Sequence, residues 1–207
     1  MIRSNWTIKL FLLIQIILVY LIFSLKSYSD SSEINNGSVI LGSDKAPVKI
    51  KIFSSLTCPH CANFHINVVT KIKKKYIKTG VVQLIFIDFP LDEAAFNASK
   101  LLHCLERKKQ MEFLDTIYET QNKWTGGTNI NIINKNLKKI VKNLGINSTE
   151  FDACLINEVI SDKILSNRID ASKKYSIEAT PTIIINEKKL EGSVNFKNIE
   201  KKINKLI

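Results

Sequence analysis

The sequence predicts an α/β fold that is interrupted by a helical insertion. Three observations predict it: a strand–helix–strand pattern that begins at Val48, a long stretch of helical patterns after Pro90, and a return of strand character at Thr182. β-Branched runs are typical of strands, and apolar residues three and four apart are typical of helices. With 207 residues, 45% of them hydrophobic, we expect one well-cored domain with an elaboration rather than two large domains.

The first part of the predicted fold is one βαβ unit. The alternating residues 48–54 predict a strand, residues 59 to about 76 predict a helix with an apolar residue at every fourth position, and the apolar run 81–87 predicts a second, fully buried strand. The motif Cys58-Pro59-His60-Cys61 lies at the turn from the first strand to the helix. In that context a CxxC motif is typical of thioredoxin-like redox proteins.

Residues 92–171 predict an inserted helical subdomain. A last helix in this region begins at Ser148-Thr149-Glu150, where either hydroxyl can cap it, breaks near Asn157 and continues towards Tyr175. The linkage 125–128, Thr-Gly-Gly-Thr, is expected to be its most flexible point. Three earlier amphipathic faces consist of Ala94, Ala98, Leu101 and Leu105; of Phe113, Leu114 and Ile117; and of Ile133, Leu137, Ile140 and Leu144.

The C-terminal part predicts two short strands and a helix. Strand character covers residues 182–186 and about 189–191, and Glu187-Lys188 is the expected tight connection. Apolar residues at every fourth position from Ile199 to Ile207 predict the helix. The predicted parts of the fold are therefore residues 38–91 with the CxxC motif, the insertion 92–171, and residues 172–207.

The first 29 residues have the pattern of an export signal. Basic residues at Arg3 and Lys9 precede an uncharged apolar run from Leu10 to Leu25, and small residues follow it. The run is shorter than the roughly 20 residues of a membrane span, although residues 6–8 could extend it. Residues 1–29 are therefore either a cleaved signal peptide or an N-terminal anchor in the inner membrane. Both predict a periplasmic or other extracytoplasmic location.

The chain is strongly basic, with a formal net charge of +11. Its lysines are spread over most segments and are not interleaved with arginines and aromatic residues on one face, so we expect no binding to nucleic acid. We interpret most of them as solvated helix faces. Attraction to anionic membrane surfaces or acidic clients is the alternative.

Cys58 and Cys61 form the expected redox-active pair. Cysteines at i and i+3 share one face of a helix and can form a disulfide across a single turn. Pro59 suits the first helical turn, which leaves Cys58 exposed at the helix N-terminus. The free backbone N–H groups and the helix dipole favour an anion there, so we expect the pKa of Cys58 to lie below its ordinary value.

A structural disulfide and a metal half-site are the alternative interpretations of this motif. His60 or His65 could join the two cysteines as ligands of zinc or copper, but no second ligand pair is present, and we expect no metal. Ala62 excludes haem attachment, because that motif requires His directly after the second Cys. We expect no other cofactor.

Two further cysteines remain, Cys104 and Cys154. In an exported chain all four can pair, and pairing of Cys58 with Cys61 leaves these two, on separate predicted helices, to form a structural disulfide. Closing a loop of about 50 residues would stabilise the insertion by roughly 4 kcal/mol. The alternative is two buried free thiols.

The combination of motifs resembles the DsbA-like thiol:disulfide interchange proteins of bacterial envelopes. It consists of residues 41–48, the run from Thr57 to Cys61, a helical insertion, and residues 179–182, Ala-Thr-Pro-Thr. The resemblance covers Ser38 to the C-terminus. It implies a thioredoxin-like fold and a monomeric enzyme that introduces disulfides into unfolded or partly folded exported proteins, with a membrane quinone reductase for its re-oxidation.

The resemblance also implies roles for single residues. Cys58 is the attacking thiolate, Cys61 the buried resolving thiol, and His60 a residue that helps to stabilise the thiolate. Pro181 resembles the family's cis-proline, which faces the CxxC motif and presents the backbone of Thr180 to an extended client. Some relatives also have a second, non-catalytic disulfide in the helical subdomain, which agrees with the pairing proposed above.

Three positions depart from the family's pattern. Many relatives carry a buried carboxylate six residues before the first active-site cysteine, where this chain has Ile52. In those relatives the carboxylate relays protons to the resolving thiol. In this chain, water or a different base would have to deprotonate Cys61. Ala179 and Glu187 stand where the family often has Gly.

Two other functions compete with disulfide donation. The first is a disulfide isomerase or reductase on the same scaffold, although residues 30–41 are too short for the dimerisation region that such isomerases usually carry. The second is a non-enzymatic envelope protein, either a copper-binding protein or a chaperone.

Overall fold

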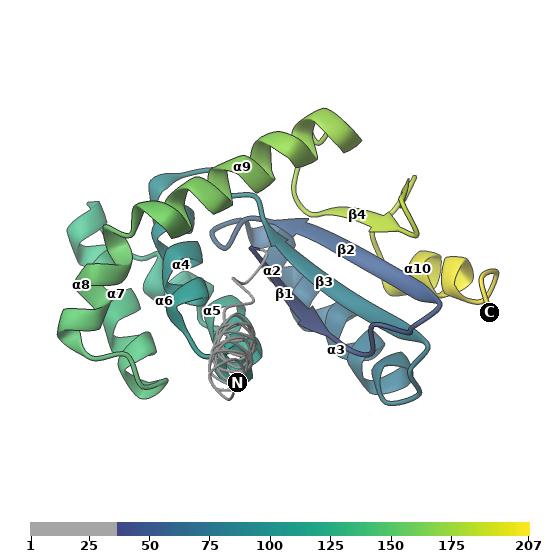
Figure 1. Ribbon diagram of the computed structural model, residues 1–207, viewed down its shortest axis with the longest axis horizontal. Helices are drawn as coiled ribbons and strands as arrows, with labels where there is room; N and C mark the ends of the chain where they lie inside the picture. The colour runs from purple at the N-terminus through teal and green to yellow at the C-terminus, as the bar shows by residue number, and fades with distance from the viewer. Residues whose placement is uncertain (1–36) are drawn as a thin grey trace, which may run out of the picture. The chain divides into compact units, whose positions relative to one another are not determined.

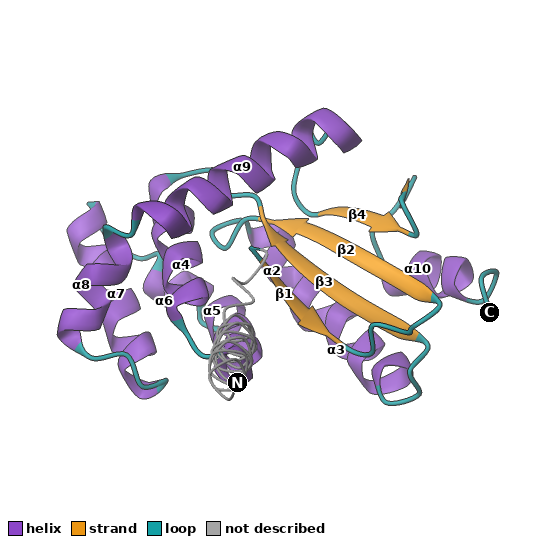
Figure 2. Cartoon of the chain, viewed as in Figure 1, coloured by secondary structure: helices purple, strands orange, loops and turns teal. Residues whose placement is uncertain are grey.

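The computed structural model describes residues 37–207, so the predicted signal peptide or anchor, residues 1–29, lies outside the described residues. The described residues form a five-stranded sheet and a group of helices, shown in Figures 1 and 2. Within this part of the chain, no helix is long and apolar enough to cross a membrane. The strands are β1 (Ser38–Leu41), β2 (Val48–Ser54), β3 (Val82–Asp88), β4 (Thr182–Ile185) and β5 (Lys188–Lys189).

The sheet has the order β1-β3-β2-β4-β5. Its two central strands, β2 and β3, run parallel, and the other pairs are antiparallel. Parallel neighbours require a crossover connection, which the helical segment between β2 and β3 provides. The predicted βαβ unit is therefore confirmed, with β3 one residue later than expected.

The crossover is helical from Pro59 to Ile77. It consists of α2 (Pro59–Phe64), the π-helical turn η1 (His65–Val69), α3 (Thr70–Ile72) and a second π-helical turn η2 (Lys73–Ile77). The predicted apolar stripe is buried, since Phe64, Val68, Ile72 and Tyr76 are at most 6% exposed. The sequence analysis did not predict the π-helical turns, because apolar residues at every fourth position do not reveal the one extra residue of a π-helical turn.

The insertion between β3 and β4 is entirely helical. Its helices are α4 (Glu93–Cys104), α5 (Arg107–Glu119), α6 (Gln121–Trp124), α7 (Ile130–Asn143), α8 (Ser148–Leu155) and α9 (Glu158–Tyr175). The last helix of the chain is α10 (Phe196–Ile203).

The sheet is buried on both faces. On one face Val48, Ile50 and Ile52 of β2 belong to a large apolar cluster that also contains residues of the crossover, of α10, and of α4, α5, α7 and α8. On the other face a smaller cluster joins Phe53 and Ile184 to Ala171 of α9. The insertion therefore shares the core of the sheet, and residues 37–207 form one compact unit.

Asparagine or aspartate side chains cap four helices of the insertion. Asp92 caps α4, Asn129 caps α7 and Asn157 caps α9, each through its side-chain oxygen. The predicted break near Asn157 is confirmed. The cap of α8 is Asn147, which forms a capping box with Glu150, so the prediction of a Ser148 or Thr149 cap is wrong.

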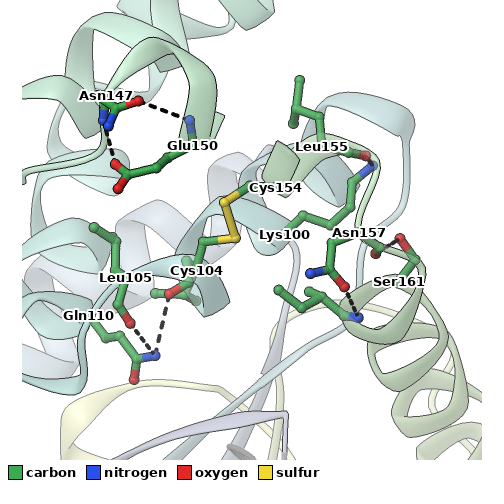
Figure 3. Close-up of a disulfide and its surroundings, with 12 residues drawn as sticks. Lys100, Cys104, Leu105, Gln110, Asn147, Glu150, Cys154, Leu155, Asn157 and Ser161 are labelled. Carbon is green, nitrogen blue, oxygen red and sulfur yellow. Dashed lines mark hydrogen bonds between the residues drawn. A yellow bond between two sulfur atoms is a disulfide. The ribbon is translucent and has the colours of Figure 1, made fainter. Parts of the chain in front are cut away.

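A disulfide joins two helices of the insertion (Figure 3). Cys104, the last residue of α4, is bonded to Cys154 of α8 with an S–S distance of 2.08 Å. Close to this bond, Gln110 donates from its side-chain amide to the carbonyl oxygens of Leu102 and Leu105, and the ammonium of Lys100 donates to that of Leu155. The disulfide closes a loop of 50 residues between segments that both pack into the large cluster.

Three details differ from the sequence predictions. Strand β1 has no predicted counterpart; it is a four-residue edge strand that forms by pairing with β3. The turn between β4 and β5 is Asn186-Glu187, one residue earlier than predicted. Helix α10 ends at Ile203, and Ile207 is 64% exposed. By contrast, helix α9 ends at Tyr175, as the sequence predicts.

The disulfide gives a direct prediction. In a variant with both active-site cysteines replaced, Cys58→Ser and Cys61→Ser, thiol titration of the unfolded, unreduced protein should detect no thiol. Replacing Cys104 and Cys154 by Ala should lower the free energy of unfolding by about 4 kcal/mol, because the unfolded chain gains the entropy of an open loop. Two titratable thiols in the first variant would contradict the pairing.

Candidate redox-active site

The CxxC motif occupies the first turn of α2. Cys58 is its N-cap residue and has an extended backbone, Pro59 is the first helical residue, and the N–H groups of Cys61 and Ala62 donate to the carbonyl of Cys58 at 3.0 and 3.1 Å. Both cysteines are free thiols. Cys58 and its neighbours face solvent in part, with His60 exposed, whereas Cys61 is only 2% exposed.

A segment far along the chain lies against Cys58. The peptide bond from Thr180 to Pro181 is cis, and the carbonyl oxygen of Thr180 accepts a hydrogen bond from the Cys58 thiol at 3.4 Å. Strand pairing explains this contact across 122 residues. Because Phe53 near the end of β2 is in register with Thr182 at the start of β4, the residues just before β4 lie beside those just after β2.

The two thiols differ in proton affinity, and that of Cys58 is lowered. Partial burial opposes ionisation of Cys58, but the Thr180 hydroxyl and the backbone N–H groups of Cys61 and His60 favour the thiolate, so the pKa of Cys58 lies below its ordinary value. The Thr180 hydroxyl is buried and has no hydrogen-bond partner among the described residues. A hydroxyl in that position is available to donate to the anion.

Cys61 behaves in the opposite way. Burial raises the pKa of the Cys61 thiol to about 12, the neighbouring charge of Cys58 adds to the increase, and contacts with Thr180 and with the Ser55 backbone offset only part of it. Cys58 therefore ionises more readily than Cys61, which holds its proton at neutral pH. This difference suits a pair in which one sulfur meets the client and the other resolves.

Contacts from the insertion support the active-site turn. The side-chain amide of Gln121 donates to the carbonyls of Leu56 and Cys58 at 2.8 and 3.1 Å. The hydroxyl of Thr57 donates to a carboxylate oxygen of Asp92 at 2.7 Å. Sequence reasoning missed both residues. Asp92 could have been found as a capping residue at the start of the helical pattern after Pro90, whereas no local pattern marks Gln121.

Buried polar groups lie in the core between the sheet and helices α4 and α5. Ile52 is 2% exposed and supplies no carboxylate. Tyr118 of α5 donates its hydroxyl to Ser54 at 3.1 Å, and burial followed by the charge of Cys61 raises the pKa of this phenol well above its ordinary value. Asp88, in register with Ser54, accepts a hydrogen bond of 2.6 Å from Ser99 and forms a contact of the same length with His103. Sequence reasoning did not predict this group.

The histidines do not complete a metal site. Nε2 of His65 lies 2.7 Å from Asp115, which also binds Lys73. Within residues 37–207, no three His, Cys, Asp or Glu side chains lie close enough together to hold a metal ion. The metal-binding alternative for Cys58, Cys61 and a histidine therefore has no structural support in the described part of the chain.

Comparisons with known proteins agree with this fold. The thioredoxin family model matches residues 34–205. The crystal structure of Wolbachia pipientis alpha-DsbA1 is 31% identical, with 82% of this chain and 90% of that chain covered and a TM-score of 0.73. A putative protein-disulfide oxidoreductase of Rickettsia typhi is 26% identical over 84% of this chain. A probable disulfide bond formation protein D of Bacillus anthracis is 28% identical, with 80% of this chain and 76% of that protein covered. This chain spans 64% of the length of the Rickettsia protein.

The site predicts two very different thiol titrations. Cys58 should react with iodoacetamide with an apparent pKa below the ordinary cysteine value, while Cys61 should stay unreactive until the pH approaches about 12. Thr180→Val should raise the pKa of Cys58, because the thiolate loses a hydroxyl donor. Thr79→Val should leave it unchanged, because that hydroxyl binds the carbonyl of Tyr76. Equal reactivity of the two thiols at pH 7 would contradict this assignment.

Proposed function

Since this chain belongs to the thioredoxin family, as a DsbA-like member, we propose that it is a thiol:disulfide oxidoreductase that introduces disulfide bonds into exported proteins. The observation that carries the proposal is the unequal proton affinity of Cys58 and Cys61, with Thr180 and a cis-proline against the exposed thiol. The roles of Cys58, Cys61, Thr180 and Pro181 at a client site are part of this proposal.

The proposed reaction begins with the oxidised enzyme. A client thiolate attacks the Cys58 sulfur, the Cys58–Cys61 bond breaks, and Cys61 takes up the electron pair and then a proton. A second client thiolate attacks the client sulfur of this mixed disulfide, and Cys58 leaves as a thiolate. The client loses two electrons and gains a disulfide, and the enzyme is left as a dithiol.

Thiolate stabilisation gives the direction of this exchange. Every pKa unit by which Cys58 is lowered favours the reduced enzyme by about 1.4 kcal/mol, and a dithiol with a stable reduced state is an oxidant. His60 is proposed to contribute through its place between the cysteines. Oxidation is therefore favoured over the isomerase and reductase alternatives on the same scaffold.

The binding site for the client is proposed at the loop before β4. The carbonyl of Thr180 stands beside the Cys58 sulfur, so an extended client segment along Thr180-Pro181 would present its cysteine to that atom. Backbone hydrogen bonding of this type is sequence-tolerant, which suits an enzyme that acts on many unfolded or partly folded chains.

Location, assembly and organisation belong to the same proposal. The signal-like residues 1–29 and a disulfide between Cys104 and Cys154 both suit an oxidising, extracytoplasmic compartment. We propose a monomer that a membrane quinone reductase re-oxidises. The CxxC part (38–91), the insertion (92–171) and the loop-bearing part (172–207) are its proposed divisions.

A trapping experiment tests the exchange. Cys61→Ala cannot release a mixed disulfide by intramolecular attack, so it should accumulate client adducts at Cys58 in the envelope fraction of expressing cells. The matched variant Cys58→Ala should form none, because Cys61 is buried. Adducts detected by non-reducing gels and mass spectrometry support the proposal; their absence from Cys61→Ala would contradict any exchange activity.

A further inference from the structure

The turn between β4 and β5 has an unfavourable backbone conformation. Asn186 and Glu187 have φ values of 42° and 66°, in the left-handed region that favours glycine. A two-residue hairpin turn commonly takes positive φ at both central residues, and a turn without glycine depends on side-chain contacts to hold that conformation. The contacts of these two residues therefore indicate what the turn is built to do.

Asn186 anchors the turn to the sheet. Its side-chain oxygen accepts from the backbone N–H of Lys49 at 2.7 Å, and its amide donates to the carbonyl of Pro47 at 3.0 Å. Glu187 binds elsewhere. Its carboxylate accepts from the ammonium of Lys174 at 2.8 Å, from the hydroxyl of Tyr175 at 2.5 Å, and from Lys51.

Two of these three donors are the last residues of α9. The next residue, Ser176, begins the segment 176–181 that ends with the cis-proline, here called the cis-proline loop. Ser176 has a φ of 48°, and its carbonyl accepts from the ammonium of Lys189 in β5 at 2.9 Å. The β4–β5 hairpin thus binds the start of the loop at two points.

The far end of the loop is held by the sheet. Thr182 pairs with Phe53 of β2, and its hydroxyl donates to the carbonyl of Ala179 at 2.6 Å. Phe53 in turn packs against Tyr175, with ring centroids 5.6 Å apart. The loop that carries Thr180 is therefore fixed at its end by strand pairing and at its start by Glu187 and Lys189.

We propose that Glu187 is a positioning residue for thiol exchange: by fixing the end of α9 it holds the cis-proline loop, and with it Thr180, against Cys58. The inference rests on the proposed function for its effect on clients, but not for its effect on the loop and on the Cys58 thiol. Glu187 acts through the loop and does not touch the reacting sulfur atoms.

The charges around Glu187 suit a permanent anchor. Hydrogen bonds from Lys174, Lys51 and Tyr175 lower the pKa of Glu187 to about 2, so the carboxylate is ionised throughout the pH range of thiol exchange. The pKa of Lys51 is raised: partial burial opposes its charge, but the bonds to Glu187 and Tyr175 outweigh that effect.

Glu187→Gln tests the proposal, because it keeps the size of the side chain and removes its charge. We expect faster amide hydrogen exchange in residues 176–180 and a higher Cys58 pKa. We also expect the KM for a cysteine-containing peptide to rise roughly threefold to tenfold with kcat little changed, which matches the loss of a few part-exposed ionic contacts. Glu191→Gln is the control, because Glu191 is an exposed residue just after β5, outside the cis-proline loop, and the same charge is removed.

A second variant covers the case in which Glu187→Gln folds poorly. Glu187→Gly also removes the carboxylate but relieves the unfavourable φ, so it should fold and still show the faster loop exchange and the raised Cys58 pKa. The proposal is overturned if loop exchange and Cys58 pKa match the wild type in both variants, or if Glu191→Gln changes them equally. A wild-type enzyme that oxidises no client would refute the proposed function and leave the loop and pKa results to decide this inference.

Discussion

The pairing of β2 with β4 is the constraint on which the site depends. It brings Thr180, which is 122 residues further along the chain, into contact with Cys58. The lowered pKa of Cys58 depends in part on this contact. The insertion between β3 and β4 must therefore fold into a compact body that returns the chain to the sheet. Its helices do so by burying their apolar faces in the same cluster as the sheet, and the bond between Cys104 and Cys154 reduces the entropy cost of ordering them.

The chemistry follows from a gradient of burial along one helical turn. Cys58 lies at the end of the turn, where backbone N–H groups and the Thr180 hydroxyl favour an anion. Cys61 lies three residues further on, inside the core, where the cost of desolvating a thiolate dominates. One short motif at a strand-to-helix turn thus produces two thiols whose pKa values are shifted in opposite directions.

Much of this arrangement is visible in the sequence, because local patterns determine it. The run from Val48 to Cys61 predicts a strand, a turn and a helix start, and all three are present. Strand β1 escaped prediction because four residues carry little pattern and become a strand only by pairing with β3. Gln121 escaped prediction because its contacts with Leu56 and Cys58 depend on how α6 packs. The turn at Asn186-Glu187 was predicted one residue too late, because neither residue is a glycine that would mark its position.

The reduction potential of the Cys58/Cys61 pair in metal-free protein tests the central claim most directly. Equilibration of the purified protein with glutathione buffers of known ratio measures it, with Cys104 and Cys154 left bonded. If the stabilised Cys58 thiolate makes this enzyme a disulfide donor, the potential should be more oxidising than about −200 mV. A potential near −270 mV or below, which is characteristic of reductants, would contradict the account.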